Sequence, residues 1–221
     1  MSYPHVINNF QDTESELSLL GIPHDVLIEV VQRAFAAYNN ATPNDPPSTA
    51  GNNAYSAAVR AMRELLRPNG WEKLDISNLC FTINANIKIA IVVSSGRQDV
   101  GIAELAEGYP RTRNSKGERT KDYIDSNCDI FGFEEKIQED IFSEFQTFIL
   151  LYYFDFEKHE IRLELSAPIA MDSKGYINKW HKRIILSPIP FDAPYTPTRK
   201  ADLSSIDDLQ DFDIPVKRRI Q

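Results

Sequence analysis

The sequence predicts an α+β fold, in which a roughly five-stranded, mostly antiparallel sheet carries helices packed on one face and a C-terminal tail follows. Two observations support this prediction. Apolar residues recur at helical spacing in the first part of the chain, whereas β-branched and aromatic residues fill two later stretches. Inside those stretches the turns are too short for parallel crossovers, so the pattern favours antiparallel hairpins over a doubly wound sheet.

Two helices are expected in the N-terminal helical part, about residues 12–70. Apolar residues keep a helical period over residues 23–40 and again over residues 54–66. Residues 41–53, between them, are rich in proline and asparagine and predict a connector without regular structure. The second helix is expected to end before Pro68, because proline cannot continue a helix.

The sheet part is expected over about residues 79–190. Residues 79–93 predict a hairpin whose second strand is almost continuously apolar, as in a strand that is covered on both faces. Residues 147–166 predict another hairpin with a turn at 155–159. Its second strand alternates apolar and polar residues, which indicates one buried and one solvent-facing side. One further strand is expected at 180–186. Two helical stretches are expected to link the hairpins, over residues 118–127 and 134–145.

The pattern predicts a single domain over residues 1–190 and an extended tail over residues 191–221. The tail contains prolines, mixes both signs of charge and has no sustained periodicity. Within it, four apolar residues recur at three-residue intervals among aspartates, which indicates a short helix that docks on a partner's groove or on this protein's own sheet edge. These residues are Leu203, Ile206, Leu209 and Phe212.

Composition and charge limit the classes of function. The chain has 221 residues, a formal net charge of -8 and a pI near 5.1, which argues against attraction of its whole surface to nucleic acid or anionic lipid. No apolar run approaches the roughly 20 residues that cross a bilayer, and the first residues do not resemble a signal peptide. Cys80 and Cys128 lie far apart and suit reduced thiols. We therefore expect a cytoplasmic protein with no membrane partner, in which any anion site is local.

One loop concentrates positive charge in this acidic chain. It contains five basic residues and a single Glu118, and the basic residues are Arg111, Arg113, Lys116, Arg119 and Lys121. Such a cluster can neutralise phosphates or meet an acidic protein face, although a solvated connector has the same composition. The loop follows a strand that ends in Ser94-Ser95-Gly96, and strand ends with glycine loops often carry binding sites.

Motifs for catalysis are weak. The chain has no glycine-rich phosphate loop and no paired histidines, so the sequence predicts no catalytic residue, metal site or cofactor. Asp155, Glu160 and Glu164 are the residue types of a metal-dependent nuclease, but their spacing is poor and solvated turn charges explain them as well. The stretch Trp180-His181-Lys182-Arg183 resembles a stacking surface for single-stranded nucleic acid, yet charges that guard an edge strand are the favoured interpretation.

These observations predict a non-catalytic, cytoplasmic accessory subunit. It is expected to bind another macromolecule, a protein complex or a nucleoprotein, through the basic loop and the C-terminal segment. The expected partner is another protein, with nucleic acid as a second partner class through the basic loop. The alternative is a metal-dependent nuclease or another nucleic-acid enzyme that uses Asp155 with Glu160 or Glu164.

Overall fold

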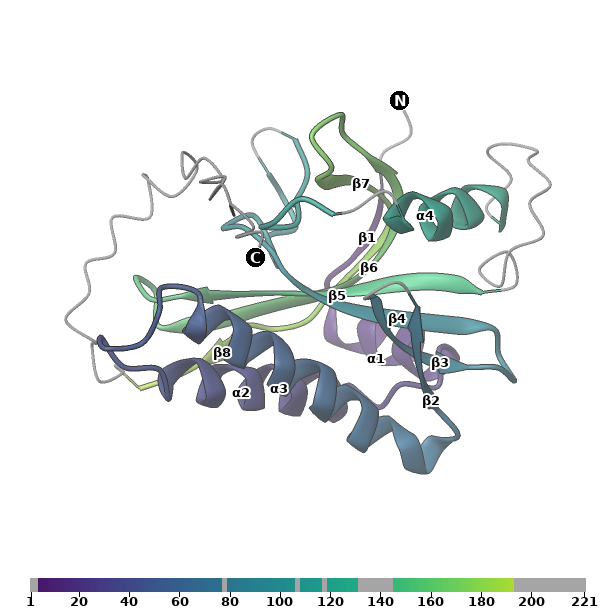
Figure 1. The fold of residues 1–221 in the computed structure, drawn as a ribbon. Coiled ribbons are helices and arrows are strands. Elements are labelled where there is room, and N and C mark those ends of the chain that lie inside the picture. Colours follow the sequence, from purple (N-terminus) through teal and green to yellow (C-terminus); the bar gives the residue numbers. More distant parts are fainter. Residues whose placement is uncertain (1–3, 77–78, 106–107, 117–118, 131–144, 193–221) are drawn as a thin grey trace, which may run out of the picture.

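A computed structural model describes residues 4–76, 79–105, 108–116, 119–130 and 145–192; within 119–130 it describes the side chains of residues 120–125 and 127. The elements are β1 (His5–Ile7), α1 (Phe10–Leu19), α2 (His24–Asn39), α3 (Thr49–Leu66), the 3-10 turn η1 (Arg67–Asn69), β2 (Glu72–Ile76), β3 (Leu79–Asn84), β4 (Ile89–Ser95), α4 (Arg119–Ile130), β5 (Gln146–Asp155), β6 (Glu160–Met171), β7 (Ile177–Ile185) and β8 (Ile189–Pro190). This composition confirms the α+β class (Figure 1).

The sheet is mixed, and the expectation of about five strands is wrong. Within the described residues eight strands form one sheet in the order β1-β7-β6-β5-β4-β3-β2, with β8 paired to β6. The β4–β5 and β1–β7 pairs are parallel, and the other pairs are antiparallel. The parallel β4–β5 pair is allowed because a long crossover, residues 96–145, connects its strands. The strands missed are short, as in the three-residue β1, or mostly charged, as in β2.

Helices cover both faces of the sheet, so the prediction of helices on one face is wrong. The N-terminal helices α1, α2 and α3 lie on one side, and α4 lies on the other (Figure 1). Strand residues alternate between the two cores: Ile91 and Leu150 pack with the N-terminal helices, whereas Val92 and Leu151 pack with Tyr123 of α4. Strand β4 is therefore buried on both faces, as its apolar composition predicted.

Helix α2 is confirmed, whereas α3 begins earlier than predicted and α1 was not predicted. Helix α2 matches the expected range, whereas α3 begins at Thr49, inside the proline-rich connector. Helix α1 was missed because only two of its side chains, Thr13 and Leu17, are buried, so it lacks an apolar stripe. Its start is set by Asn9, whose side chain accepts hydrogen bonds from the backbone N–H groups of Gln11 and Asp12.

The side of β6 that carries Arg162, Glu164 and Ser166 is buried, so the predicted solvent-facing side is wrong. The chain that follows β4 covers it: the Gly101 N–H donates to Glu164 Oε2 at 3.0 Å, and Arg183 Nη2 donates to the Ile102 carbonyl at 3.0 Å. A Cβ atom at Gly101 would lie 2.9 Å from Arg162 Cβ, and the φ of Gly101 is +74°, so this close approach requires glycine.

The interpretation of residues 180–183 as a guarded edge strand is also wrong. Strand β7 lies between β6 and β1, and Trp180 and Arg183 are buried. The Trp180 indole N–H donates to the Pro110 carbonyl at 2.7 Å, which ties the sheet to the basic loop. Because the indole is only 2% exposed, it offers no stacking surface for a nucleobase.

Candidate functional site

The basic loop is held in place by its backbone. Arg113 donates from its N–H to the Ser95 carbonyl at 3.0 Å, and Thr112 donates to the Ile177 carbonyl at 3.2 Å. Lys116 donates to the Gly175 carbonyl at 2.8 Å. The segment thus runs between the end of β4 and the start of β7, with Thr112 fully buried. These bonds fix the backbone positions from which the basic side chains extend.

Glycine is needed at the two points where this segment meets its neighbours. A Cβ atom at Gly96 would lie 2.2 Å from Val100 Cγ2, and a Cβ atom at Gly175 would lie 2.9 Å from the Lys116 carbonyl oxygen. The φ of Gly175 is +84°, which side chains disfavour. Gly96, which follows β4, therefore leaves room for the Val100 side chain, and Gly175 lets the β6–β7 turn approach the backbone of the loop.

Two arginines share one tyrosine ring at this point. The guanidinium carbon of Arg111 lies 5.1 Å from the centroid of the Tyr176 ring, and that of Arg97 lies 5.6 Å from it. The two guanidinium groups are thus no farther apart than the sum of these distances. Cation–π contacts of this kind contribute about 0.5–1 kcal/mol at exposed sites and restrict the orientation of the planar groups. Each guanidinium keeps its N–H donors for other partners.

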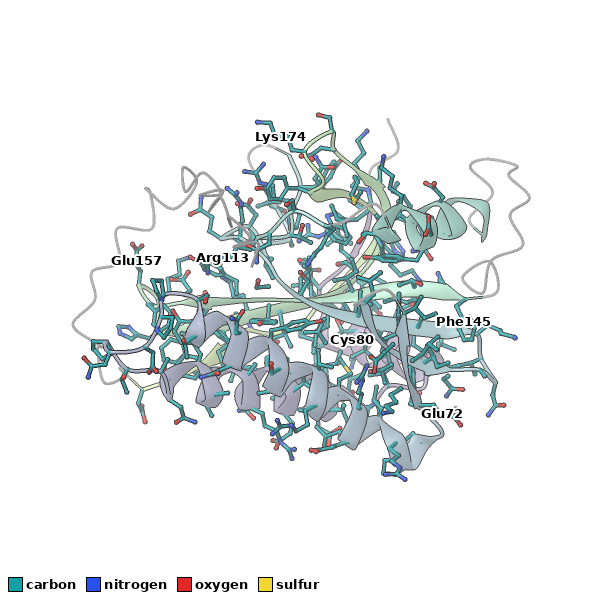
Figure 2. All side chains as sticks on the ribbon, in the orientation of Figure 1. Glu72, Cys80, Arg113, Phe145, Glu157 and Lys174 are labelled. Atoms are coloured by element: carbon teal, nitrogen blue, oxygen red, sulfur yellow. The ribbon has the colours of Figure 1, made fainter. Side chains whose placement is uncertain are left out.

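We call the basic surface this ring and its two arginines together with the cations of the adjoining loop and turn, namely Arg97, Arg111, Arg113, Lys116, Lys174 and Tyr176. Lys174 belongs to it because the Gly175 carbonyl of its turn accepts the hydrogen bond from the Lys116 N–H. The labelled side chains of Arg113 and Lys174 lie on the side of the sheet opposite α2 and α3 (Figure 2). Arg113 and Lys174 are exposed, whereas Lys116 is half-buried and burial lowers the pKa of its ammonium group.

The cations of the basic surface lack carboxylate partners among the described residues, whereas four arginines elsewhere in the fold have them. Arg183 pairs with Glu164, Arg162 with Asp155, Arg63 with Asp75 and Arg33 with Glu29. Asp172, in the same turn as Lys174, forms no salt bridge with these cations; its Oδ1 accepts from the N–H groups of Lys174 and Tyr176 at 2.9 Å each. Within the described ranges, the basic surface therefore carries five cations that no salt bridge neutralises, on a protein of net charge -8.

The predicted basic residues are only partly brought together. Arg111, Arg113 and Lys116 belong to the basic surface, and Arg97 and Tyr176 join them although neither lies in the predicted loop. Arg119 begins α4, and its side chain lies outside the described residues. Lys121 is exposed on α4, and no contact within the described part of the chain joins it to the basic surface.

The other predicted binding residues, Leu203, Ile206, Leu209 and Phe212, lie outside the described residues, as does the helix expected over residues 134–145 except for Phe145, which is buried and is not helical. The part of the tail that is described, residues 191–192, follows β8 directly. Phe191 stacks on Phe35 of α2 with ring centroids 4.3 Å apart, and its N–H donates to the His159 carbonyl at 3.0 Å. The chain is thus held to the domain up to Phe191.

The three carboxylates of the nuclease alternative are bound to protein groups. Glu164 accepts from Arg183 Nη2 at 2.5 Å and from Ser166 Oγ at 2.8 Å. Asp155 accepts from Arg162 Nη2 at 2.9 Å, and Glu160 lies 3.6 Å from Arg162 Nε. In the described ranges no three His, Cys, Asp or Glu side chains converge as metal ligands. These contacts organise the sheet and its hairpin.

No family model, curated protein or solved structure matches the chain. Over the described ranges, no helix combines the length and the apolar character needed to cross a bilayer.

Proposed function

We propose that this protein is a non-catalytic accessory subunit that binds an acidic region of another protein through the basic surface. One observation carries the proposal: the fold holds Arg97 and Arg111 on Tyr176, beside Arg113 and two lysines, without neutralising them within the described residues. Unpaired guanidinium groups that are already oriented form bidentate bonds to carboxylates with little loss of side-chain entropy. In this proposal the protein is cytoplasmic, and Leu203, Ile206, Leu209 and Phe212 form a second contact with the partner.

An acidic protein suits this surface better than a nucleic acid does. A net charge of -8 repels a long polyanion, and five described cations neutralise only a few phosphates. The Tyr176 ring is already engaged by two guanidinium groups, and Trp180 is buried, so neither ring is free to stack on bases. A short acidic segment of a protein requires neither a long basic groove nor stacking rings.

The experiment compares two charge-matched triple variants of the full chain. Arg111→Gln, Arg113→Gln and Lys174→Gln remove three cations from the basic surface, and Arg60→Gln, Arg67→Gln and Lys73→Gln remove three exposed cations from α3, η1 and β2. The probe is a fluorescein-labelled decaglutamate peptide, and binding is measured by fluorescence anisotropy at low salt. We expect the first variant to weaken binding at least about tenfold, or about 1.4 kcal/mol, and the second to change it less than about twofold.

Two outcomes would overturn the proposal. Equal weakening by both variants would show that net charge alone attracts the probe. Tighter binding of an oligothymidylate of equal charge than of decaglutamate would assign the basic surface to nucleic acid. No contact in the described part of the chain supports the nuclease alternative. Plasmid cleavage by the wild-type protein that occurs only with added Mg²⁺ or Mn²⁺ would favour the nuclease function over partner binding.

A further inference from the structure

The C-terminal segment has the chemistry that the proposed surface would recognise. Residues 201–213 contain five aspartates and no lysine or arginine and lie between Arg199-Lys200 and Lys217-Arg218-Arg219; we call residues 201–213 the acidic segment. The basic surface has five cations without carboxylate partners among the described residues. From this complementarity we propose that the acidic segment binds the basic surface of its own chain and so competes with an external acidic partner. This inference rests on the proposed function.

The connection between the two is long enough. The described chain ends at Asp192, next to Phe191, which is anchored on α2. An extended chain spans about 3.3–3.6 Å per residue, so Asp207 can lie up to about 50 Å from Asp192. A folded domain of about 190 residues has a radius of gyration of about 16 Å, so a tether of about 50 Å can reach most of the surface of the domain. The acidic segment can therefore reach the opposite side of the sheet.

Covalent attachment makes even a weak contact effective. A segment on a tether of this kind acts at an effective concentration on the order of 1 mM. If the isolated segment bound with a dissociation constant of about 0.1 mM, it would occupy the basic surface roughly nine-tenths of the time and weaken an external acidic ligand about tenfold. Because both contacts depend on charge, added salt should weaken them together. The partner must then outcompete the acidic segment, which raises the intrinsic affinity that a target needs in order to bind.

The first test measures competition in the full chain. Asp207→Asn, Asp208→Asn and Asp211→Asn remove three charges from the acidic segment, and Glu14→Gln, Asp25→Asn and Glu72→Gln remove three exposed charges from α1, α2 and β2. Both variants have the same net charge. We expect the first to bind labelled decaglutamate at least about threefold more tightly than the second at low salt, with the difference lost at high salt. Equal affinities would overturn the inference.

The second test locates the contact without any partner. A water-soluble carbodiimide activates a carboxylate, and a nearby amine then displaces the urea to form an amide. In the wild-type chain we expect amides between aspartates of the acidic segment and Lys116 or Lys174, identified by mass spectrometry in the monomer band. Cross-links only between chains, or only to lysines outside the basic surface, would overturn binding within one chain. If decaglutamate binding still depends on Arg111 and Arg113, the proposed function survives that result.

Discussion

The buried Glu164–Arg183 ion pair makes a quantitative prediction for stability. The Glu164 and Arg183 residues are 0% and 1% exposed, and Glu164 also accepts from the Gly101 N–H. Glu164→Gln keeps the shape of the side chain but leaves the Arg183 charge buried without a counter-charge. Removal of one partner from a buried pair destabilises a protein by about 3–5 kcal/mol. Since about 2–4 °C of Tm corresponds to 1 kcal/mol at this length, we expect Tm to fall by about 6–20 °C.

The measurement is urea and thermal unfolding at neutral pH, followed by circular dichroism, with two comparison variants. Glu29→Gln removes the exposed pair with Arg33 and should change the free energy of unfolding by less than about 1 kcal/mol. Glu164→Leu combined with Arg183→Met removes both charges and should be less destabilising than Glu164→Gln, because no charge stays buried alone. A loss below about 1 kcal/mol for Glu164→Gln would refute the reasoning, as would a double variant that is less stable than the single one.

Two further predictions concern backbone geometry and pH. Gly101→Ala should lower the free energy of unfolding, measured by urea denaturation, by at least about 1 kcal/mol more than Gly70→Ala does. Both glycines have positive φ, but only at Gly101 would the new Cβ meet another side chain, that of Arg162 at 2.9 Å. Equal losses of stability in the two variants would contradict the described packing. The pKa of His181 is lowered by burial and by Lys182, so the unfolded state binds the proton more readily. Stability should therefore fall as pH drops from the unfolded pKa toward the lower folded pKa, and His181→Gln should make this fall shallower; an unchanged slope would contradict it.

Local sequence signals predicted helix α2 and the two hairpins. Helix α2 was found from its helical period, and the hairpins β3–β4 and β5–β6 from β-branched and aromatic residues that flank short turns. Strand β8 was missed, because Pro188 and Pro190 argue against a strand, yet β8 pairs with β6 through Ile189. Short pairings of this kind are decided by the rest of the fold rather than by their own sequence.

The errors at β6 and at the basic surface have a common cause. The alternation of β6 indicated solvent beside Glu164, but its partner Arg183 and its covering Gly101 come from distant parts of the chain. The basic loop was found from its composition, whereas Tyr176 was missed because only the β6–β7 turn brings its ring to Arg111. Contacts between residues far apart in sequence leave no local signal, and such contacts decide which charges are exposed.

The parallel β4–β5 pair determines when the basic surface can exist during folding. Strands β2, β3 and β4 can pair through short connections, as can β5, β6 and β7, so the two halves of the sheet can form separately. Joining them requires closure of the loop over residues 96–145, and such long-range pairing is slow. Within that loop, Arg113 is bound to Ser95 at the end of β4 and Lys116 to Gly175 in the second half, so the loop has both contacts only after the halves meet. A partner that requires this surface would therefore bind only chains that have completed their folding.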